Sequence, residues 1–380
     1  MEQFPHIRVA GSAAECGRQY GQQARERVAR SVAVYREVFA HYTGWDWARV
    51  RQEAARFEAP IAAFRPAYLA EMRGIAEGAG LDPLDVLAIN VRTEVMYAAK
   101  ARQAAGQRPG PGECTAFAVA PAPGATGPAL AGQNWDWLPH MAQTVVVLEA
   151  QQDSGPDFVT VVEAGLLAKT GMNSAGLGLV TNAMVTSDDA GQPGLPYHVL
   201  LRAILDSETV SGALRALQEA PRSSAANYLI SHRDGSAVDV EAAPGDFSRL
   251  FLVFPDGDGV ITHTNHFLSP RFDGRDVSVW AMPDSPVRLQ RLQAGLRARP
   301  GRSLADFRAL LTDHANYPSA ICCHPDTRSH PYDQGTTVNS VLMDLTAQRL
   351  WIADGPPCTV PYRELDYAGF LAGPPASAAA

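Results

Sequence analysis

A short run of chain-breaking residues divides this 380-residue sequence into two parts of different character. Residues 109–112 read Pro-Gly-Pro-Gly, a composition that stops helices and strands alike, and they lead into Glu113 and Cys114. Before the run, apolar residues recur at helical spacing; after it, short β-prone stretches alternate with turn residues. We therefore expect a helical N-terminal segment, residues 1–113, and a second segment, residues 114–380, rich in strands.

The second segment alternates groups of strands with pairs of helices. The helix pairs are expected near residues 197–206 with 210–220 and 287–296 with 303–313, and strand-like stretches lie before, between and after them. This order fits a layered α+β architecture in which two sheets pack face to face and helices cover the outside. We predict a four-layer αββα sandwich that carries the helical N-terminal segment.

Composition excludes several classes of function. The formal net charge is −8 and basic residues are not clustered, so we expect no nucleic-acid partner. No run approaches the ~18 apolar residues that cross a bilayer, and the first residues do not resemble a signal peptide, so we expect no membrane association. Five cysteines, an odd number, fit a reducing and hence cytoplasmic location. No nucleotide-binding loop is present, and we expect no cofactor.

Cys114 is the main candidate for chemistry. If its thiol attacked the carbonyl of Glu113, hydrolysis of the ester-like product would leave Cys114 with a free α-amino group. That group has a pKa of about 7.7–8.0 in model peptides and can act as the base for its own thiol. The alternative interpretation is a structural one, because a cysteine that opens a strand is usually a small buried hydrophobic residue.

An N-terminal nucleophile also needs supporting groups. Asp136 could hold the α-ammonium group, while Asn182 and Asn265 lie at the ends of strand-like stretches and can donate side-chain N–H groups to an oxyanion. Thr115 and His263 are expected to line the substrate pocket. Packing in the core is the default alternative for aromatic residues near these positions.

Six stretches in a fixed order resemble the isopenicillin-N acyltransferase family of self-cleaving N-terminal-nucleophile hydrolases. They are Cys114-Thr115, residues 132–136, residues 163–165, residues 171–176, residues 263–266 and residues 316–318. The resemblance implies the αββα fold, cleavage between Glu113 and Cys114, and two fragments that stay together. It also implies that Cys114 is the nucleophile, Asp136 supports its amino group and Asn265 is an oxyanion donor.

Two positions depart from that pattern. Glu113 stands where the penicillin enzyme has glycine, and Cys323 stands where that enzyme has arginine. We therefore expect Cys323 to alter substrate binding, and Arg328 is close enough in sequence to replace the arginine. Cys322, Cys323 and His324 with Cys358 could suggest a metal site, but adjacent cysteines lack the usual C-x₂₋₄-C ligand spacing, so we expect no metal.

The sequence thus predicts an autoproteolytic cysteine amide hydrolase or acyltransferase with an acyl-cysteine intermediate. Its substrate would be a small N-acyl compound, with an acyl thioester as a further donor, and its partner would be its own cleaved N-terminal fragment. One alternative is a catalytically degenerate ligand-binding or scaffold protein of the same fold. Bile-salt hydrolases are a third candidate, but they begin at the nucleophile, and the long helical segment before Cys114 argues against them.

Overall fold

Two β-sheets form the centre of the protein. The structure, a computed structural model, describes residues 3–102, 114–121, 127–299 and 303–372. One sheet has eight strands in the order β1-β4-β5-β6-β7-β8-β9-β10, and the other has six in the order β11-β2-β3-β12-β13-β14. Apart from the parallel pair β1 and β4, neighbouring strands in both sheets are antiparallel.

The eight-stranded sheet comprises β1 (His6–Gly11), β4 (Val145–Gln152), β5 (Phe158–Glu163), β6 (Thr170–Asn173), β7 (Leu177–Ala183), β8 (Ala226–His232), β9 (Ala237–Ala242) and β10 (Leu250–Val253). The six-stranded sheet comprises β11 (Val260–His263), β2 (Cys114–Val119), β3 (Leu130–Trp137), β12 (Thr336–Asp344), β13 (Arg349–Ala353) and β14 (Arg363–Asp366). Strands β2 and β3 pack against β7 of the opposite sheet, so the first residue of β2 lies between the sheets.

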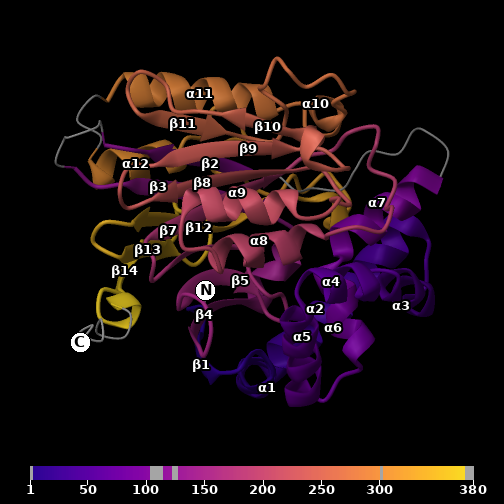
Figure 1. The fold of residues 1–380 in the computed structure, drawn as a ribbon. Helices are drawn as coiled ribbons and strands as arrows, with labels where there is room; N and C mark the ends of the chain where they lie inside the picture. Colours follow the sequence, from indigo (N-terminus) through magenta and orange to yellow (C-terminus); the bar gives the residue numbers. More distant parts are fainter. Residues whose placement is uncertain (1–2, 103–113, 122–126, 300–302, 373–380) are drawn as a thin grey trace, which may run out of the picture.

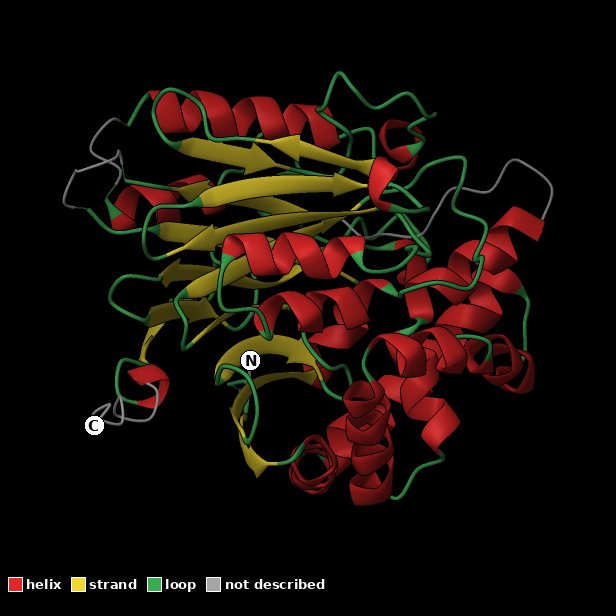
Figure 2. Ribbon diagram, viewed as in Figure 1, coloured by secondary structure: helices red, strands yellow, loops and turns green. Residues whose placement is uncertain are grey.

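Helices cover both outer faces (Figures 1 and 2). Helices α8 (Tyr197–Leu205) and α9 (Val210–Gln218) pack on the eight-stranded sheet, and α11 (Ser285–Arg297) and α12 (Leu304–Leu311) pack on the six-stranded sheet. The short α10 (Ser278–Ala281) precedes α11. The described residues also form short 3₁₀ helices: η1 (Pro139–Thr144), η2 (Phe247–Arg249), η3 (Pro331–Asp333) and η4 (Phe370–Ala372). The predicted four-layer αββα sandwich is confirmed.

The N-terminal segment is mainly helical, as expected, but it begins with a strand. Its helices are α1 (Ala13–Gln23), α2 (Arg25–Thr43), α3 (Trp47–Ala55), α4 (Glu58–Phe64), α5 (Pro66–Ala79), α6 (Pro83–Asn90) and α7 (Arg92–Arg102). Strand β1 adds to the edge of the eight-stranded sheet beside β4. Only Ile7 and Val9 alternate with exposed residues there, and two apolar residues are too few to predict a strand.

Glycines bring α1 and α5 into backbone contact. A Cβ atom on Gly17 would lie 2.1 Å from the carbonyl oxygen of Glu71, and one on Gly21 would lie 2.1 Å from that of Ile75. On the facing helix, a Cβ on Gly78 would meet the carbonyl oxygen of Arg18 at 2.2 Å. No side chain fits at these distances, so the glycines fix how closely the two helices pack.

Buried ion pairs join the N-terminal segment to the rest of the protein. The Arg92 guanidinium of α7 lies 2.8 Å from the Glu163 carboxylate at the end of β5, and the Arg202 guanidinium of α8 lies 2.7 Å from the Glu71 carboxylate of α5. All four side chains are almost completely buried. Removing one partner of such a pair leaves an uncompensated buried charge, so both pairs fix the N-terminal segment against the sandwich. Among the described residues, no helix is long and apolar enough to cross a membrane.

Candidate active site

Cys114 is the first residue of β2 and is only 4% exposed. It lies opposite Trp135 of β3 in the strand register. Burial raises the pKa of its thiol to about 11, although the positive charge of Lys169, a hydrogen bond to the Asp136 backbone and the charge of Arg288 oppose that effect. The thiol is therefore neutral near pH 7, and it needs a base to become a nucleophile.

Three side chains hold the backbone of Cys114 on both sides. Its N–H donates to Asn265 Oδ1 at 2.8 Å. Its carbonyl oxygen accepts from Asn182 Nδ2 at 3.0 Å and from Arg288 Nη1 at 2.7 Å. Asn182 lies on β7 of the opposite sheet, Asn265 follows β11 and Arg288 lies on α11. Elements from three layers thus fix the position of the nucleophile, and the structure brings both predicted asparagines to it.

The orientation of the Asn265 amide is set by its neighbours. Its oxygen accepts from two N–H groups, those of the Cys114 backbone and Arg288 Nη2 (2.9 Å), whereas its nitrogen donates to the carbonyl oxygen of Ala183 at 2.9 Å. Flipping the amide would place donors against donors. The oxygen of Asn265 therefore faces the nitrogen of Cys114, which is the geometry for orienting an amine. The role of Asn265 as an oxyanion donor stays a prediction.

Asp136 is buried beside Cys114, and its two carboxylate oxygens differ in their contacts. Oδ1 accepts from Thr337 Oγ1 at 2.5 Å, while Oδ2 has no hydrogen-bond partner within the described part of the chain. Burial raises the pKa of this carboxyl to about 7, against the opposing effects of Arg288 and Thr337. A buried carboxylate oxygen without a donor is costly unless a cation binds there. The position of Asp136 suits the predicted support of an ammonium group.

Arg288 is the arginine that reaches this site. Besides Cys114 and Asn265, it donates to Thr115 Oγ1 at 3.1 Å and forms a 2.6 Å ion pair with Asp284, the N-cap residue of α11. Its side chain is completely buried. No motif in the sequence distinguished it, because an arginine in a helix with other arginines is usually a surface residue.

Lys169 is a second site residue that the sequence analysis missed. Its Nζ lies 3.7 Å from the centroid of the Trp135 ring, and burial lowers its pKa to about 8. The signal that could have found it is composition, since the chain has only two lysines, Lys100 and Lys169, and the second ends an apolar stretch. Its charge is one of the few effects that favour the Cys114 thiolate.

His263, which we predict to line the substrate pocket, is bonded to buried acidic side chains. Its ring is buried, and Nε2 forms a hydrogen bond with Glu241 at 2.9 Å. Burial lowers the pKa of His263, but the charge of Asp239 and the contacts with Glu241 outweigh burial, so the pKa is raised overall. It belongs to a charged cluster of the core, although Asn182 also reaches its carbonyl oxygen at 3.5 Å.

Cys323 contacts the site through its backbone. Its N–H donates to Thr337 Oγ1 at 2.9 Å, and the same hydroxyl donates to Asp136. Arg328 does not replace the missing arginine, because it is exposed and pairs with Asp326. Glu113, on the other side of the predicted scissile bond, lies outside the described residues.

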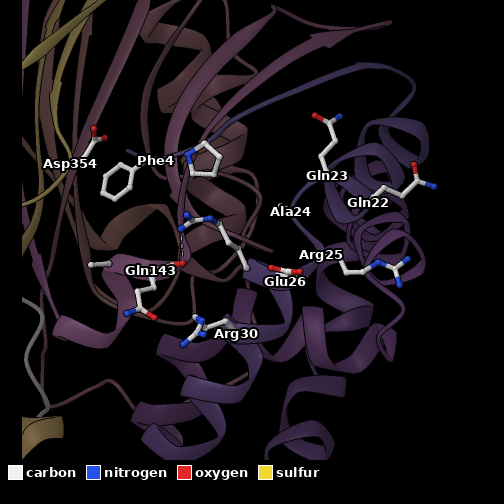
Figure 3. A pocket seen from close by; sticks show the side chains of 12 residues that line it. Phe4, Gln22, Gln23, Ala24, Arg25, Glu26, Arg30, Gln143 and Asp354 are labelled. Carbon is white, nitrogen blue, oxygen red and sulfur yellow. Dashed lines mark hydrogen bonds between the residues drawn. The ribbon is translucent and has the colours of Figure 1, made fainter. Parts of the chain in front are cut away.

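A hollow of about 890 Å³ lies elsewhere, between the N-terminal helices and η1 (Figure 3). Arg25 and Arg30 of α2, Gln143 of η1 and Asp354 after β13 line it. None of the side chains around Cys114 borders it. We therefore do not assign the acyl substrate to this hollow.

Comparison with known proteins gives one family. Residues 124–357 match the family model described as acyl-coenzyme A:6-aminopenicillanic acid acyl-transferase. A curated relative, the 40 kDa form of acyl-coenzyme A:6-aminopenicillanic-acid-acyltransferase from Emericella nidulans, is 27% identical over 354 residues, which are 93% of this chain and 93% of that protein.

Solved structures give more remote likenesses. A variant of conjugated bile acid hydrolase from Clostridium perfringens has a TM-score of 0.46 and 15% identity, covering 69% of this chain and 95% of that one. Penicillin V acylase from Agrobacterium tumefaciens has a TM-score of 0.40 and 16% identity, covering 67% and 86%.

Proposed function

The chain belongs to the acyl-coenzyme A:6-aminopenicillanic acid acyl-transferase family and is an enzyme that transfers acyl groups or hydrolyses amides, and we propose that it does so through Cys114 after cleaving its own chain there. The observation that carries the proposal is the clamp on the Cys114 backbone. Asn265 Oδ1 faces its nitrogen, and Asn182 and Arg288 face its carbonyl oxygen. An ordinary buried cysteine does not need three polar side chains on its backbone.

Self-cleavage would begin with attack of the Cys114 sulfur on the carbonyl carbon of Glu113. The C–N bond breaks, a C–S thioester forms, and the proton of the thiol passes to the nitrogen of Cys114, which becomes an amine. Water then hydrolyses the thioester, returning the thiol and leaving a carboxylate on Glu113. The hydrogen bond from Cys114 N to Asn265 Oδ1 would hold the leaving nitrogen throughout.

The new α-amine would serve as the base. Asn265 Oδ1 already faces this nitrogen, and Asp136 Oδ2 is an acceptor to which none of the described residues donates. We propose that these two oxygens orient the amine so that it takes the proton of the thiol and returns it to the leaving group. The nearby charge of Lys169 would favour the thiolate.

We propose a small N-acyl compound as substrate, cleaved to an acyl-Cys114 thioester and then passed to water or to an amine. An acyl thioester could load the same cysteine, since the name of the Emericella nidulans relative includes acyl-coenzyme A. Trp135, against which the Lys169 amine stacks, would provide an apolar wall near the sulfur.

We further propose that residues 1–113 remain bound after cleavage as a small subunit. The Arg92–Glu163 and Glu71–Arg202 pairs and strand β1 in the main sheet support this, because none of them requires the bond before Cys114.

The test is to trap the acyl-enzyme. Purified protein is incubated briefly with a panel of N-acyl amino acids, N-acyl amines and acyl thioesters, quenched in acid and measured by intact mass and peptide mapping. We expect the mass of one acyl group on the peptide that begins at Cys114, and none in Cys114→Ala. Acylation of another residue, or turnover of these substrates by Cys114→Ala, would contradict the proposal.

A further inference from the structure

Four side chains of the types that can ligate metals, two histidines and two cysteines, converge on the surface next to the six-stranded sheet. His314, Cys322 and His324 lie in the loop that follows α12, and Cys358 lies in the loop between β13 and β14. One ligand atom from each residue lies within 4.8 Å of the other three. Cys322 is buried, His324 is half-buried, and His314 and Cys358 are exposed, so an ion could reach the cluster from solvent.

The distances among these atoms match those of a tetrahedral zinc site. With Zn–S near 2.3 Å and Zn–N near 2.0–2.1 Å, the ligand atoms of a tetrahedral site lie about 3.3–3.8 Å apart. In the structure, His324 Nε2 lies 3.1 Å from His314 Nε2, 3.6 Å from Cys322 Sγ and 3.4 Å from Cys358 Sγ. Small movements of these side chains would complete the geometry.

Hydrogen bonds alone do not account for the cluster. A ring nitrogen carries either one hydrogen or one lone pair, so His324 Nε2 can make one good hydrogen bond. It nevertheless faces three polar atoms, one nitrogen and two sulfurs, at close range. A single ion at the common centre satisfies all four ligand atoms at once, each through its own lone pair.

We propose that His314, Cys322, His324 and Cys358 form a structural Zn²⁺ site. Two thiolates and two imidazoles in a closed tetrahedron are the donor set of structural zinc sites. Both thiols would release their protons to solvent when the ion binds. The expectation of no metal rested on the adjacent pair Cys322 and Cys323, but the ligand pair is Cys322 and Cys358, separated in sequence and joined by the fold.

The position of the site suggests what the ion holds in place. It would tie the loop after α12 to the loop between β13 and β14. Cys323, the residue after a ligand, exchanges backbone contacts with Thr337, whose hydroxyl bonds Asp136. The zinc would thus fix the loop that positions the Asp136 carboxylate, while making no contact with the reacting atoms. This inference does not require that Cys114 be the nucleophile.

Metal analysis of the full-length protein tests the proposal. After purification under reducing conditions and dialysis against metal-free buffer, we expect about one zinc per chain by inductively coupled plasma mass spectrometry. Replacing zinc by Co²⁺ should give the intense visible absorption of a tetrahedral thiolate site. Cys358→Ser and His314→Gln should lose the zinc, and because both residues are exposed these variants should still fold.

Matched substitutions elsewhere provide the controls. Cys16→Ala removes a free cysteine in α1, and His140→Gln removes an exposed histidine, so both should keep the zinc. Zinc that remains in Cys358→Ser and His314→Gln would overturn the proposal. So would a reduced wild-type protein that takes up no zinc or cobalt, or one whose Cys322 and Cys358 are found as a disulfide.

Discussion

Two cysteines of this protein are buried in loops or strand ends beside the same sheet, yet their surroundings differ in kind. The backbone of Cys114 is held by two side-chain amides and a guanidinium, those of Asn182, Asn265 and Arg288. Cys322 is surrounded by two imidazole nitrogens and a second sulfur that approach its own sulfur. The residues around Cys114 fix its backbone and leave its thiol to react. The residues around Cys322 place four potential metal-ligand atoms close to one another. The neighbours of a cysteine, rather than its burial, therefore separate a candidate nucleophile from a candidate metal ligand.

The largest effect should come from removing the two sulfurs in turn. Cys114→Ala should lower kcat/KM for an amide substrate by about 10³-fold or more, because no other group can carry the acyl chain. Cys358→Ser should change it far less, since that sulfur lies outside the site. Steady-state kinetics on matched preparations provides the measurement. Comparable losses in the two variants would remove the distinction between the two cysteines.

Arg288, which holds the backbone of Cys114, should also contribute more to the free energy of unfolding than an arginine that pairs near the proposed zinc ligands. Arg288→Met leaves the Asp284 carboxylate buried without its partner and should lower the free energy of unfolding by about 3–5 kcal/mol. Arg291, three residues later on α11, pairs with Asp313 at the surface, and Arg291→Met should cost less than about 1 kcal/mol. Urea denaturation of both variants checks the difference. Equal costs would mean that Arg288 does not act as a buried clamp.

Several of the residues around Cys114 could be predicted from the sequence, but the proposed zinc site could not. Cys114, Asn182 and Asn265 lie at the ends of strand-like stretches, and a sheet brings such ends together. Arg288 and Lys169 could not be placed, because their neighbours come from other layers. The proposed zinc ligands come from two loops, and Cys358 follows His324 by 34 residues. No rule for the spacing of metal ligands in a sequence predicts such a pair.

The fold shows the same limit. The apolar run at residues 158–163 predicts a strand with the bounds that β5 has, whereas the sequence patterns predict no strand at β1, β6 or β14. Strand β6 has only four residues, one of them Gly171, and the turn residues at 172–176 predict a turn over its last two positions, whereas the strand continues to Asn173. Short strands depend on their partner strands for their conformation, and local sequence carries too little signal for them.

The carboxylate of Asp136 should make the uncleaved protein less stable as pH rises. Its folded-state pKa is about 7, above the ordinary value of 3.8, so the folded chain holds a proton that the unfolded chain has lost between these two values. Stability should therefore fall from about pH 4 to pH 7, by on the order of a few kcal/mol from this group. The comparison is Cys114→Ala against Cys114→Ala with Asp136→Asn, using unfolding at several pH values. If the two proteins show the same pH dependence, Asp136 does not titrate as described.

We expect Lys169 to make a smaller contribution to the pH dependence of stability, with the opposite sign. Burial lowers its pKa to about 8 from 10.5, so the folded protein loses its proton earlier than the unfolded chain does. The cost of burying the charge is present below pH 8 and is relieved as pH rises towards 10.5. The stability of the wild type should thus rise relative to Lys169→Met across that range, as thermal unfolding can show. A constant difference between the two would contradict a buried, titrating lysine.

The most direct test of the account is the intact mass of the purified wild-type protein, measured under denaturing conditions. The account predicts two polypeptides, residues 1–113 and residues 114–380, that elute together under native conditions, and a single chain of 380 residues for Cys114→Ala. A wild-type protein that remains one chain and still transfers or hydrolyses acyl groups would contradict the central claim that Cys114 acts as a self-generated N-terminal nucleophile.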